Sequence, residues 1–276
     1  MNEMYLIVTI IVVQIISVHS RNVVYNLPQW IFNSTEIENK TKAAPRYPEQ
    51  QWKNISTSHS KEDIFAYQNF FYGISNGLVV ETGIGQFSST LFLERIANWK
   101  AIHIEADPTV FKQLIHRRSN QVNIHAALCS TSKEVHFVPS KHEAQGIYEF
   151  MSSDFLKLWH PHLLSNPKKV EELQTLLCVP VSTLLQKIGI KKVDLWILDE
   201  HLGDGSDTDV LKGLDSNQTT IDVITFHETQ SLDDNHSKQT EHKVHILEAI
   251  GYNCDTYKSG MRWCLHKNFT PSKMNQ

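Results

Sequence analysis

Apolar runs alternate with amphipathic segments along most of the chain after residue 61, and the clearest such unit spans residues 77–108. It contains, in order, an apolar run at 78–80, two glycines at Gly83 and Gly85, apolar positions at helical spacing over 86–97 and a second apolar run at 101–106. This succession is typical of a strand, a tight turn, a helix and a second parallel strand. The pattern therefore predicts an α/β fold in which a doubly wound sheet is buried on both faces.

The rest of the chain continues the same alternation. Asp107 followed by Pro108 predicts a helix start, because Asp caps a helix and Pro suits its first position. The stretch 146–169 is less regular, and we expect it to form an irregular segment that lies over the sheet edge or over the mouth of the active site. Further strands are predicted at 122–128, 134–138, 179–181, 193–198 and 221–226, helices at 63–71, 182–189 (capped by Ser182) and 243–251, and a hairpin at 254–266.

The glycine turn indicates a nucleoside site. It follows the first strand, and Glu105 ends the second strand, where a carboxylate can bind ribose hydroxyls. A dinucleotide fingerprint needs a third glycine, but the corresponding residue is Ser88. Glu81 also suits the cationic end of S-adenosylmethionine better than a pyrophosphate, which it would repel. The sequence thus favours S-adenosylmethionine as cofactor, and the alternative is an ordinary turn with a solvated strand end.

Several blocks in a fixed order resemble the FkbM-type methyltransferase domain over residues 71–267, with most similarity to its animal Star-like branch. They are LVVETGIGQF, LFLE, NWKAIHIEADP, AALCS, CVPVSTLL, VDLWILD and VLKGLD. The resemblance implies a class I methyltransferase (Rossmann-like) fold, mostly parallel with an antiparallel last strand. It places Glu81, Gly83 and Gly85 along the methionine moiety and Glu105 at the ribose. FkbM-type enzymes methylate hydroxyl groups of sugars and small molecules, whereas the Star-like branch is associated with secretory trafficking.

Strand ends supply the candidate catalytic residues. Asp199 and His201 follow one predicted strand, and His227 with Glu228 follows another. One of them would act as the base that removes the proton of an acceptor hydroxyl, and Asp199 would also line the cofactor site. The chain departs from the family pattern D-x-E-G-x-E after Asp199, where several residues are inserted. The insertion indicates altered specificity or lost activity, so a non-catalytic lumenal or secreted binding or trafficking factor is the alternative function.

The amino-terminal part predicts entry into the secretory pathway. Residues 1–20 contain an uncharged apolar segment typical of a signal peptide or of a retained signal anchor. Residues 21–61 are polar and irregular, carry three N-glycosylation sequons (Asn33, Asn39 and Asn54) and predict a stem or linker. Three aromatic residues of this stretch, Trp30, Phe32 and Trp52, could dock on the domain. The methyltransferase-like domain is expected over 62–270. The protein would be secreted or lumenal in the ER or Golgi, or a single-pass type II membrane protein if the anchor is kept.

Charge and cysteines add limits on the partners. A net charge of −4 provides no basic field for nucleic acid or anionic lipid, so a small-molecule or glycan acceptor is expected. Cys254 and Cys264 could face each other across the predicted hairpin, which would leave Cys129 and Cys178 as the second pair, or all four could be reduced core thiols. No metal site is expected, because His160 and His162 lack further ligands nearby in sequence.

Overall fold

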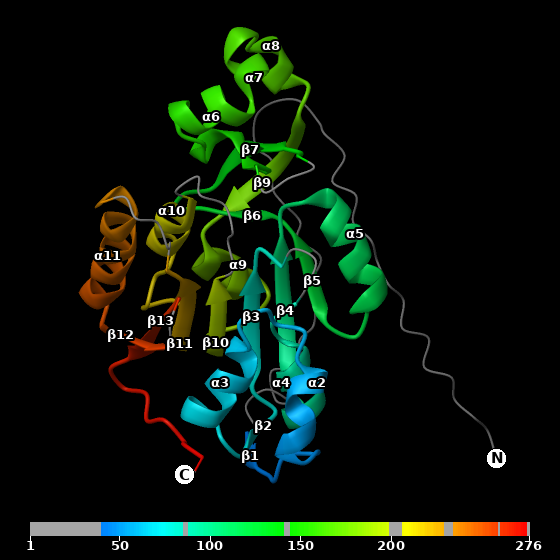
Figure 1. The fold of residues 1–276 in the computed structure, drawn as a ribbon, viewed down its shortest axis with the longest axis vertical. Coiled ribbons are helices and arrows are strands. Elements are labelled where there is room, and N and C mark those ends of the chain that lie inside the picture. The colour runs from blue at the N-terminus through cyan, green and yellow to red at the C-terminus, as the bar shows by residue number, and fades with distance from the viewer. Residues whose placement is uncertain are drawn as a thin grey trace, which may run out of the picture.

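A computed structural model describes residues 40–84, 88–140, 144–198, 206–228, 234–258 and 260–274. In these residues the larger sheet has seven strands in the order β12-β13-β11-β10-β3-β4-β5 (Figure 1). Their bounds are β3 Leu78–Thr82, β4 Lys100–Glu105, β5 Val122–His125, β10 Lys192–Leu198, β11 Thr220–His227, β12 Tyr252–Lys258 and β13 Met261–His266. The pairs β10/β11, β10/β3, β3/β4 and β4/β5 are parallel, whereas β13 is antiparallel to both neighbours. This topology confirms the predicted mostly parallel sheet with an antiparallel last strand.

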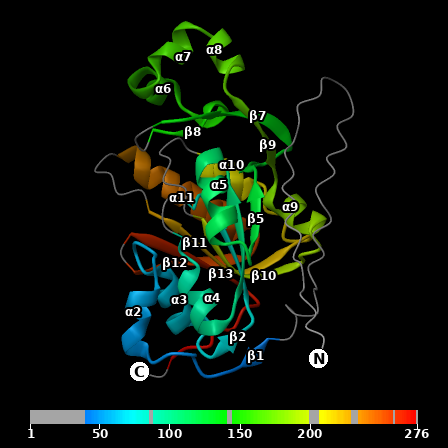
Figure 2. The same ribbon diagram turned by 90° about the vertical axis from the view of Figure 1, so that its right-hand side faces the viewer.

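Helices cover both faces of this sheet, as a doubly wound fold requires (Figure 2). On one face, α9 (Val181–Lys187), α10 (Ser206–Lys212) and α11 (Asp234–Ala249) pack over a mainly aliphatic core. On the other face, α2 (Trp52–Ile55), α3 (Glu62–Phe70) and α4 (Leu91–Ala97) enclose a core rich in aromatic rings. Strand β3 contributes to both cores, because Leu78 and Val80 face the first and Val79 faces the second.

The predicted β-α-β unit is present as β3, α4 and β4, but its helix begins later than expected. Helical spacing starts at residue 86 in the sequence, whereas α4 begins at Leu91. The segment Ser88–Thr90 instead forms hydrogen bonds to side chains beneath the turn. The next helix, α5 (Pro108–Arg117), starts as predicted, since the Asp107 carboxylate accepts hydrogen bonds from the N–H groups of Thr109 and Val110.

A second sheet is inserted between β5 and β10. It has the order β6-β9-β7-β8, with β6 Ala127–Leu128, β7 Lys133–Val138, β8 Gly146–Ile147 and β9 Gln174–Val179. The single strand expected over 122–128 was wrong, because the chain leaves the main sheet at Ala126 and continues as β6. The irregular stretch forms 3-10 helix η2 (Tyr148–Phe150) and three short helices at one end of the long axis (Figure 1): α6 Ser153–Trp159, α7 Pro161–Ser165 and α8 Lys168–Glu171.

Ser182 does not cap α9, contrary to expectation. The helix begins at Val181 after Pro180, which makes no side-chain capping bond. The Ser182 hydroxyl instead accepts a hydrogen bond from the Asp215 N–H at 2.8 Å and lies 3.3 Å from its carbonyl oxygen. Ser182 thus ties α9 to the segment after α10.

Both expected cysteine pairs form disulfides. Cys129 and Cys178 link the end of β6 to β9, and Cys254 and Cys264 face each other across the β12/β13 hairpin. The reduced-thiol alternative is therefore not supported.

Packed structure is already present before residue 62. Strand β1 (Thr41–Lys42) pairs with β2 (Ile74–Ser75), and the 3-10 helix η1 (Glu49–Gln51) leads into α2. Trp52 docks on the domain with only 2% of its surface exposed, between the rings of Tyr67 and Phe92. Within the described ranges no helix is both long and apolar enough to cross a bilayer. The predicted signal segment lies outside the described residues.

Candidate functional site

Three of the predicted site residues lie at one edge of the central sheet. Glu105 ends β4, Gly83 follows β3, and His227 ends β11. Asp199 and His201 follow β10, between β3 and β11, but lie outside the described residues, as does Gly85. Because these strands are parallel, their carboxyl ends share one edge, which is where α/β sheets bind ligands.

Gly83 and Glu105 are close neighbours at this edge. The Gly83 N–H donates to the carbonyl oxygen of Ile104 at 3.3 Å, so the turn after β3 begins beside the last residue of β4. Gly83 has φ +73°, a left-handed conformation that glycine adopts without a Cβ penalty. Glu105 is 6% exposed, and its Oε1 accepts the Asp107 N–H at 2.7 Å. The turn at Gly83, which has no side chain, therefore lies next to the oriented carboxylate of Glu105.

Glu81 is fully buried under the turn and faces the α3/α4 side of the sheet. Its carboxylate accepts hydrogen bonds from the Ser88 hydroxyl at 2.7 Å and from the Ser89 N–H at 2.5 Å. The Thr90 hydroxyl lies 3.5 Å away. These bonds join the end of β3 to the segment that leads into α4. The geometry favours a role for Glu81 in holding the turn over direct contact with a ligand.

Arg118 provides the positive charge of this buried cluster. Its guanidinium donates to the hydroxyls of Ser88 and Thr90 at 3.0 and 2.9 Å and pairs with the Glu94 carboxylate. Arg118 is 9% exposed and comes from the end of α5, whereas Glu94 lies in α4. The cation thus connects two helices to the segment that follows the glycine turn.

His103 occupies the centre of the cluster in its neutral form. It pairs in register with Glu81 on the adjacent strand, and its Nε2 lies 3.1 Å from the Thr90 hydroxyl. Its Nδ1 lies 2.9 Å from the side-chain oxygen of Asn123. Burial, and then the charge of Arg118, lowers the pKa of His103 to about 3. A neutral imidazole can donate through one nitrogen and accept through the other, so it can link Thr90 to Asn123.

A second branch of the cluster ties the turn to α3. The Ser89 hydroxyl donates to Glu62 at 2.6 Å, and Glu62 also bonds the Ser58 hydroxyl. Next to it, Asp63 is completely buried and accepts from the Ser56 hydroxyl at 2.7 Å. Burial is the main cause that raises the pKa of Asp63 to about 7, and the charge of Glu62 adds to it. We name the set Glu62, Glu81, Ser88, Ser89, Thr90, Glu94, His103 and Arg118 the turn cluster.

The sequence patterns identified few members of the turn cluster. Glu81 was singled out for its place before the glycines, and Ser88 only as a missing glycine. Glu94 and Arg118 read as ordinary helix charges, and His103 as a polar residue within a strand. The one available signal is the run Ser88–Thr90, whose three hydroxyl side chains sit in a segment predicted as helix.

The two candidates at the end of β11 have different surroundings. His227 is half-buried and pairs in register with Met261 of β13. Glu228 lies 2.7 Å from the Nε of Arg262 and accepts the Thr256 hydroxyl at 2.9 Å. Glu228 is therefore held by the hairpin.

The histidines at positions 160 and 162 differ in their surroundings. His160 is buried, with its Nε2 2.6 Å from the Ala144 carbonyl oxygen, and His162 is exposed. Among the residues that the structure describes, no group of three or more His, Cys, Asp or Glu side chains is arranged to hold a metal ion.

Similar folds occur among solved structures. Methanococcus jannaschii fibrillarin, a pre-rRNA processing protein, matches at 12% identity with a TM-score of 0.39, covering 70% of this chain and 68% of its own. A TehB-like SAM-dependent methyltransferase from Corynebacterium glutamicum matches at 9% identity with a TM-score of 0.35, covering 81% and 95%. Aeropyrum pernix fibrillarin, with natively bound S-adenosyl-L-methionine, matches at 9% identity with a TM-score of 0.34, covering 69% and 67%.

No family model and no curated protein matches the chain. At these identities and TM-scores the structural matches carry no argument about function. The fold assignment rests on the strand order and directions described above.

Proposed function

We propose that the protein is an S-adenosylmethionine-dependent methyltransferase that modifies a hydroxyl group of a small molecule or glycan in the secretory pathway. The observation that carries this proposal is the contact between two strand ends. Gly83 turns in a left-handed conformation while its N–H bonds to Ile104, the residue before Glu105. In a doubly wound sheet, a glycine turn beside a strand-end carboxylate is the arrangement that binds a nucleoside.

The residues present fit the methyl donor. Gly83 has no Cβ, so the backbone can approach a ligand closely. Glu105 offers carboxylate oxygens for two ribose hydroxyls, and its Oε1 is oriented by the Asp107 N–H. Buried acidic groups beneath the turn suit a cationic ligand and disfavour a pyrophosphate. When bound, S-adenosylmethionine supplies a methyl group made electrophilic by its sulfonium.

The remaining work for the protein is to align and deprotonate the acceptor. Alignment of a hydroxyl oxygen with the methyl group accounts for much of the acceleration expected in such a displacement. A nearby base would accept the hydroxyl proton, since an alcohol is otherwise a poor nucleophile. His227 lies two strands from β3, about 10 Å across the sheet at the usual strand spacing. Asp199 and His201, beyond the end of the intervening strand, are further candidates.

The proposal also places the protein in the secretory pathway. Two disulfides suit an oxidising environment, where such bonds persist. The FkbM-type resemblance, the predicted signal or anchor at 1–20 and the sequons agree with a secreted or lumenal protein.

Donor binding is the decisive test. Purified secreted protein would be heated with and without millimolar S-adenosylmethionine or S-adenosylhomocysteine. A ligand present at 100 times its dissociation constant stabilises the folded state by about 2.7 kcal/mol, so a clear rise in melting temperature is expected. Glu105→Ala should abolish this rise, whereas Glu134→Ala, which removes an exposed carboxylate on β7, should not change it.

Absence of any shift in the unaltered protein would contradict the proposal. It would favour the alternative, a non-catalytic protein that keeps the fold as a lumenal binding or trafficking factor. A shift that survives Glu105→Ala would place the donor elsewhere.

A further inference from the structure

Three N-glycosylation sequons have side chains that the structure describes. They begin at Asn54, Asn217 and Asn268, and all three asparagines are exposed. Attachment of an N-glycan needs the pattern Asn-x-Ser/Thr, that is, a hydroxyl two residues after the asparagine. The surroundings of this hydroxyl differ among the three sequons, and they distinguish a hydroxyl that the fold uses from one that it does not use.

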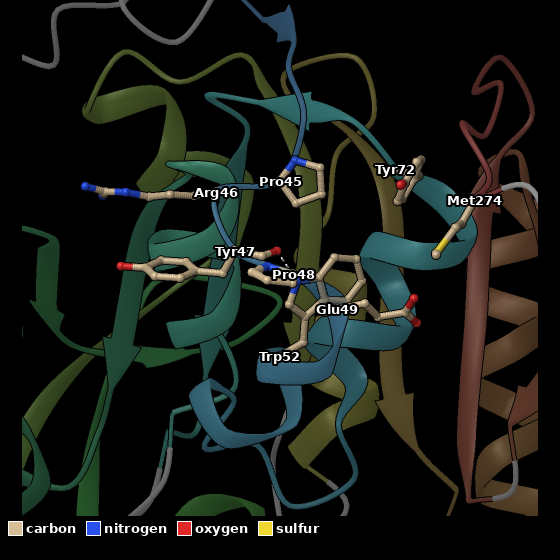
Figure 3. A pocket seen from close by; sticks show the side chains of 8 residues that line it. All are labelled: Pro45, Arg46, Tyr47, Pro48, Glu49, Trp52, Tyr72 and Met274. Atoms are coloured by element: carbon tan, nitrogen blue, oxygen red, sulfur yellow. Dashed lines mark hydrogen bonds between the residues drawn. The ribbon is translucent and has the colours of Figure 1, made fainter.

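The hydroxyl of the first sequon has a structural role. Ser56 follows α2, whose first residue, Trp52, lines the depression drawn in Figure 3. The buried Ser56 hydroxyl donates to the Asp63 Oδ1 at 2.7 Å, which fastens the end of α2 to α3. The fold itself requires a hydroxyl at Ser56, so this residue is no evidence for a glycan on Asn54.

The hydroxyl residue of the third sequon is exposed. Thr270 follows β13 and lies at the surface. An exposed hydroxyl needs no partner in the protein, because water satisfies it. Thr270 is therefore no evidence for or against a glycan on Asn268.

Thr219, the hydroxyl residue of the second sequon, is in a different position. It is 1% exposed, and its Oγ1 has no hydrogen-bond partner among the residues that the structure describes. A buried hydroxyl without a partner destabilises the folded state. Valine has nearly the shape of threonine and no polar side-chain atom, so packing alone would favour valine at this position. The fold does not explain the hydroxyl of Thr219.

The turn that carries this sequon presents Asn217 to solvent. It joins α10 to β11, and the Asp215 carboxylate accepts the Asn217 N–H at 2.9 Å and the Gln218 side-chain amide at 2.7 Å. The carbonyl oxygen of Asp215 accepts the Thr219 N–H at 3.0 Å. A glycan is bulky and solvated, and an exposed turn can carry it without disturbing the core.

We propose that Asn217 carries an N-linked glycan and that the Thr219 hydroxyl serves the recognition of this sequon by the glycan-transferring enzyme. In the transfer, the Asn217 Nδ2 forms a bond to the anomeric carbon of a lipid-linked oligosaccharide. The bond from that carbon to the lipid pyrophosphate breaks, the lipid pyrophosphate leaves, and the amide loses one proton. Transfer acts on the chain before it folds, so the later burial of Thr219 does not prevent it.

The glycan would lie far from the candidate methyl-donor site. Asn217 precedes β11, which begins at Thr220 and ends at His227, about 23 Å away at the usual rise of a strand residue. The inference rests on the secretory compartment of the proposed function and not on methyl transfer. Removal of the glycan should leave the thermal shift caused by the methyl donor unchanged.

The test is the occupancy of each sequon in the full chain, expressed in animal cells with its own amino-terminal segment. Peptide N-glycosidase converts a glycan-bearing asparagine to aspartate, and digestion in heavy-oxygen water labels the product for tandem mass spectrometry. Asn217 should be labelled in most molecules. Thr219→Val should abolish this label, and Thr219→Ser should keep it. Thr220→Val, which removes the hydroxyl of the next residue, is the matched control and should keep it too.

A second measurement asks whether the fold needs the hydroxyl. Asn217→Gln is compared with the double variant Asn217→Gln/Thr219→Val, so that neither protein carries the glycan. The double variant should melt about 2–4 °C higher, because it no longer buries an unpaired hydroxyl. A lower melting temperature would show that the hydroxyl supports the fold, and would overturn its assignment to the sequon.

Two patterns of occupancy would overturn the proposal. Glycans at other sequons but none at Asn217 would overturn it alone. Absence of glycan at every sequon would overturn it together with the proposed compartment, whereas binding of the methyl donor is read separately by the thermal shift. Occupancy is measured in whole-cell lysate, and because transfer precedes folding it does not depend on whether a variant folds.

Discussion

The two edges of the central sheet use charged residues in different ways. At the carboxyl edge, the turn cluster buries three carboxylates, a neutral histidine and one arginine beneath the glycine turn. At the amino edge, Asp194 accepts the N–H of Leu78 at 2.8 Å, where β10 and β3 begin, and pairs with Lys40. One group of charges surrounds a turn, whereas the other fastens the start of two strands.

This difference indicates what each edge is built for. Burying ions is costly, and well-packed apolar residues often stabilise a core as much or more. A cluster that fixes Ser88, Ser89 and Thr90 after the glycines is therefore better explained by the need to hold the turn in one conformation than by stability. If so, perturbing the carboxyl edge should change both stability and donor binding, and perturbing the amino edge should change stability alone.

Removing Arg118 should have the largest effect. Arg118→Met leaves the Glu94 carboxylate without its cation, and removing one partner of such a buried pair typically costs about 3–5 kcal/mol. Urea unfolding would measure the loss, and a titration with S-adenosylhomocysteine would measure the weaker donor binding expected from a misplaced turn. Arg117→Met is the matched control, because Arg117 is the exposed neighbour on α5.

A second substitution checks the cause of that loss. Adding Glu94→Gln to Arg118→Met removes one uncompensated charge and should recover part of the stability. Equal stability of Arg118→Met and Arg117→Met would mean that Arg118 does not compensate a buried charge in the turn cluster.

The pH dependence of stability should identify Asp63, beside the turn cluster. The pKa of its carboxyl rises from 3.8 to about 7 on folding, so between these values the unfolded chain is ionised while the folded chain is protonated. Stability is therefore fully present below pH 4 and is lost as the pH rises towards 7. Asp63→Asn does not titrate and should escape this loss.

The measurement is the free energy of urea unfolding at pH 5 and pH 8. Between these values the unaltered protein should lose about 2–3 kcal/mol relative to Asp63→Asn, since one pKa unit corresponds to about 1.4 kcal/mol. The lowered pKa of His103 acts in the opposite direction, because its contribution is lost as the pH falls below 6.5, but it is common to both proteins. Asp154→Asn, at an exposed position on α6, should follow the unaltered protein.

The sequence predicted those parts of the fold that depend on local patterns. The unit β3-α4-β4, the capped start of α5 and the hairpin that pairs Cys254 with Cys264 follow from apolar spacing, Asp107-Pro108 and a short turn. The strand split at Ala126 could not be predicted, because apolar positions continue through it. Only the pairing of β6 with β9 shows that the chain has entered a second sheet.

The turn cluster was hidden for a related reason. Glu62, Glu94 and Arg118 belong to three helical segments, where a charged residue usually faces solvent. Arg118 bonds residues that lie 24 to 30 positions earlier in the chain, and Glu62 bonds Ser89, 27 positions later, so no helical or strand period relates the contacts that join these segments. Patterns identify glycines and strand ends well, whereas buried polar networks become visible only when the elements are assembled.

A substitution at the amino edge completes the comparison with the smallest effect. Asp194→Ala removes the acceptor of the Leu78 N–H and the partner of Lys40, and should cost about 1–3 kcal/mol, the usual penalty for an unsatisfied buried donor. Asp194→Asn keeps an acceptor oxygen and should recover much of this loss. Donor affinity in both variants should equal that of the unaltered protein, because the contacts at the start of β3 lie at the opposite edge from Gly83. If Asp194→Ala weakened donor binding as much as Arg118→Met does, the two edges would be coupled through β3, and the turn cluster could not be regarded as a separate device for holding the turn.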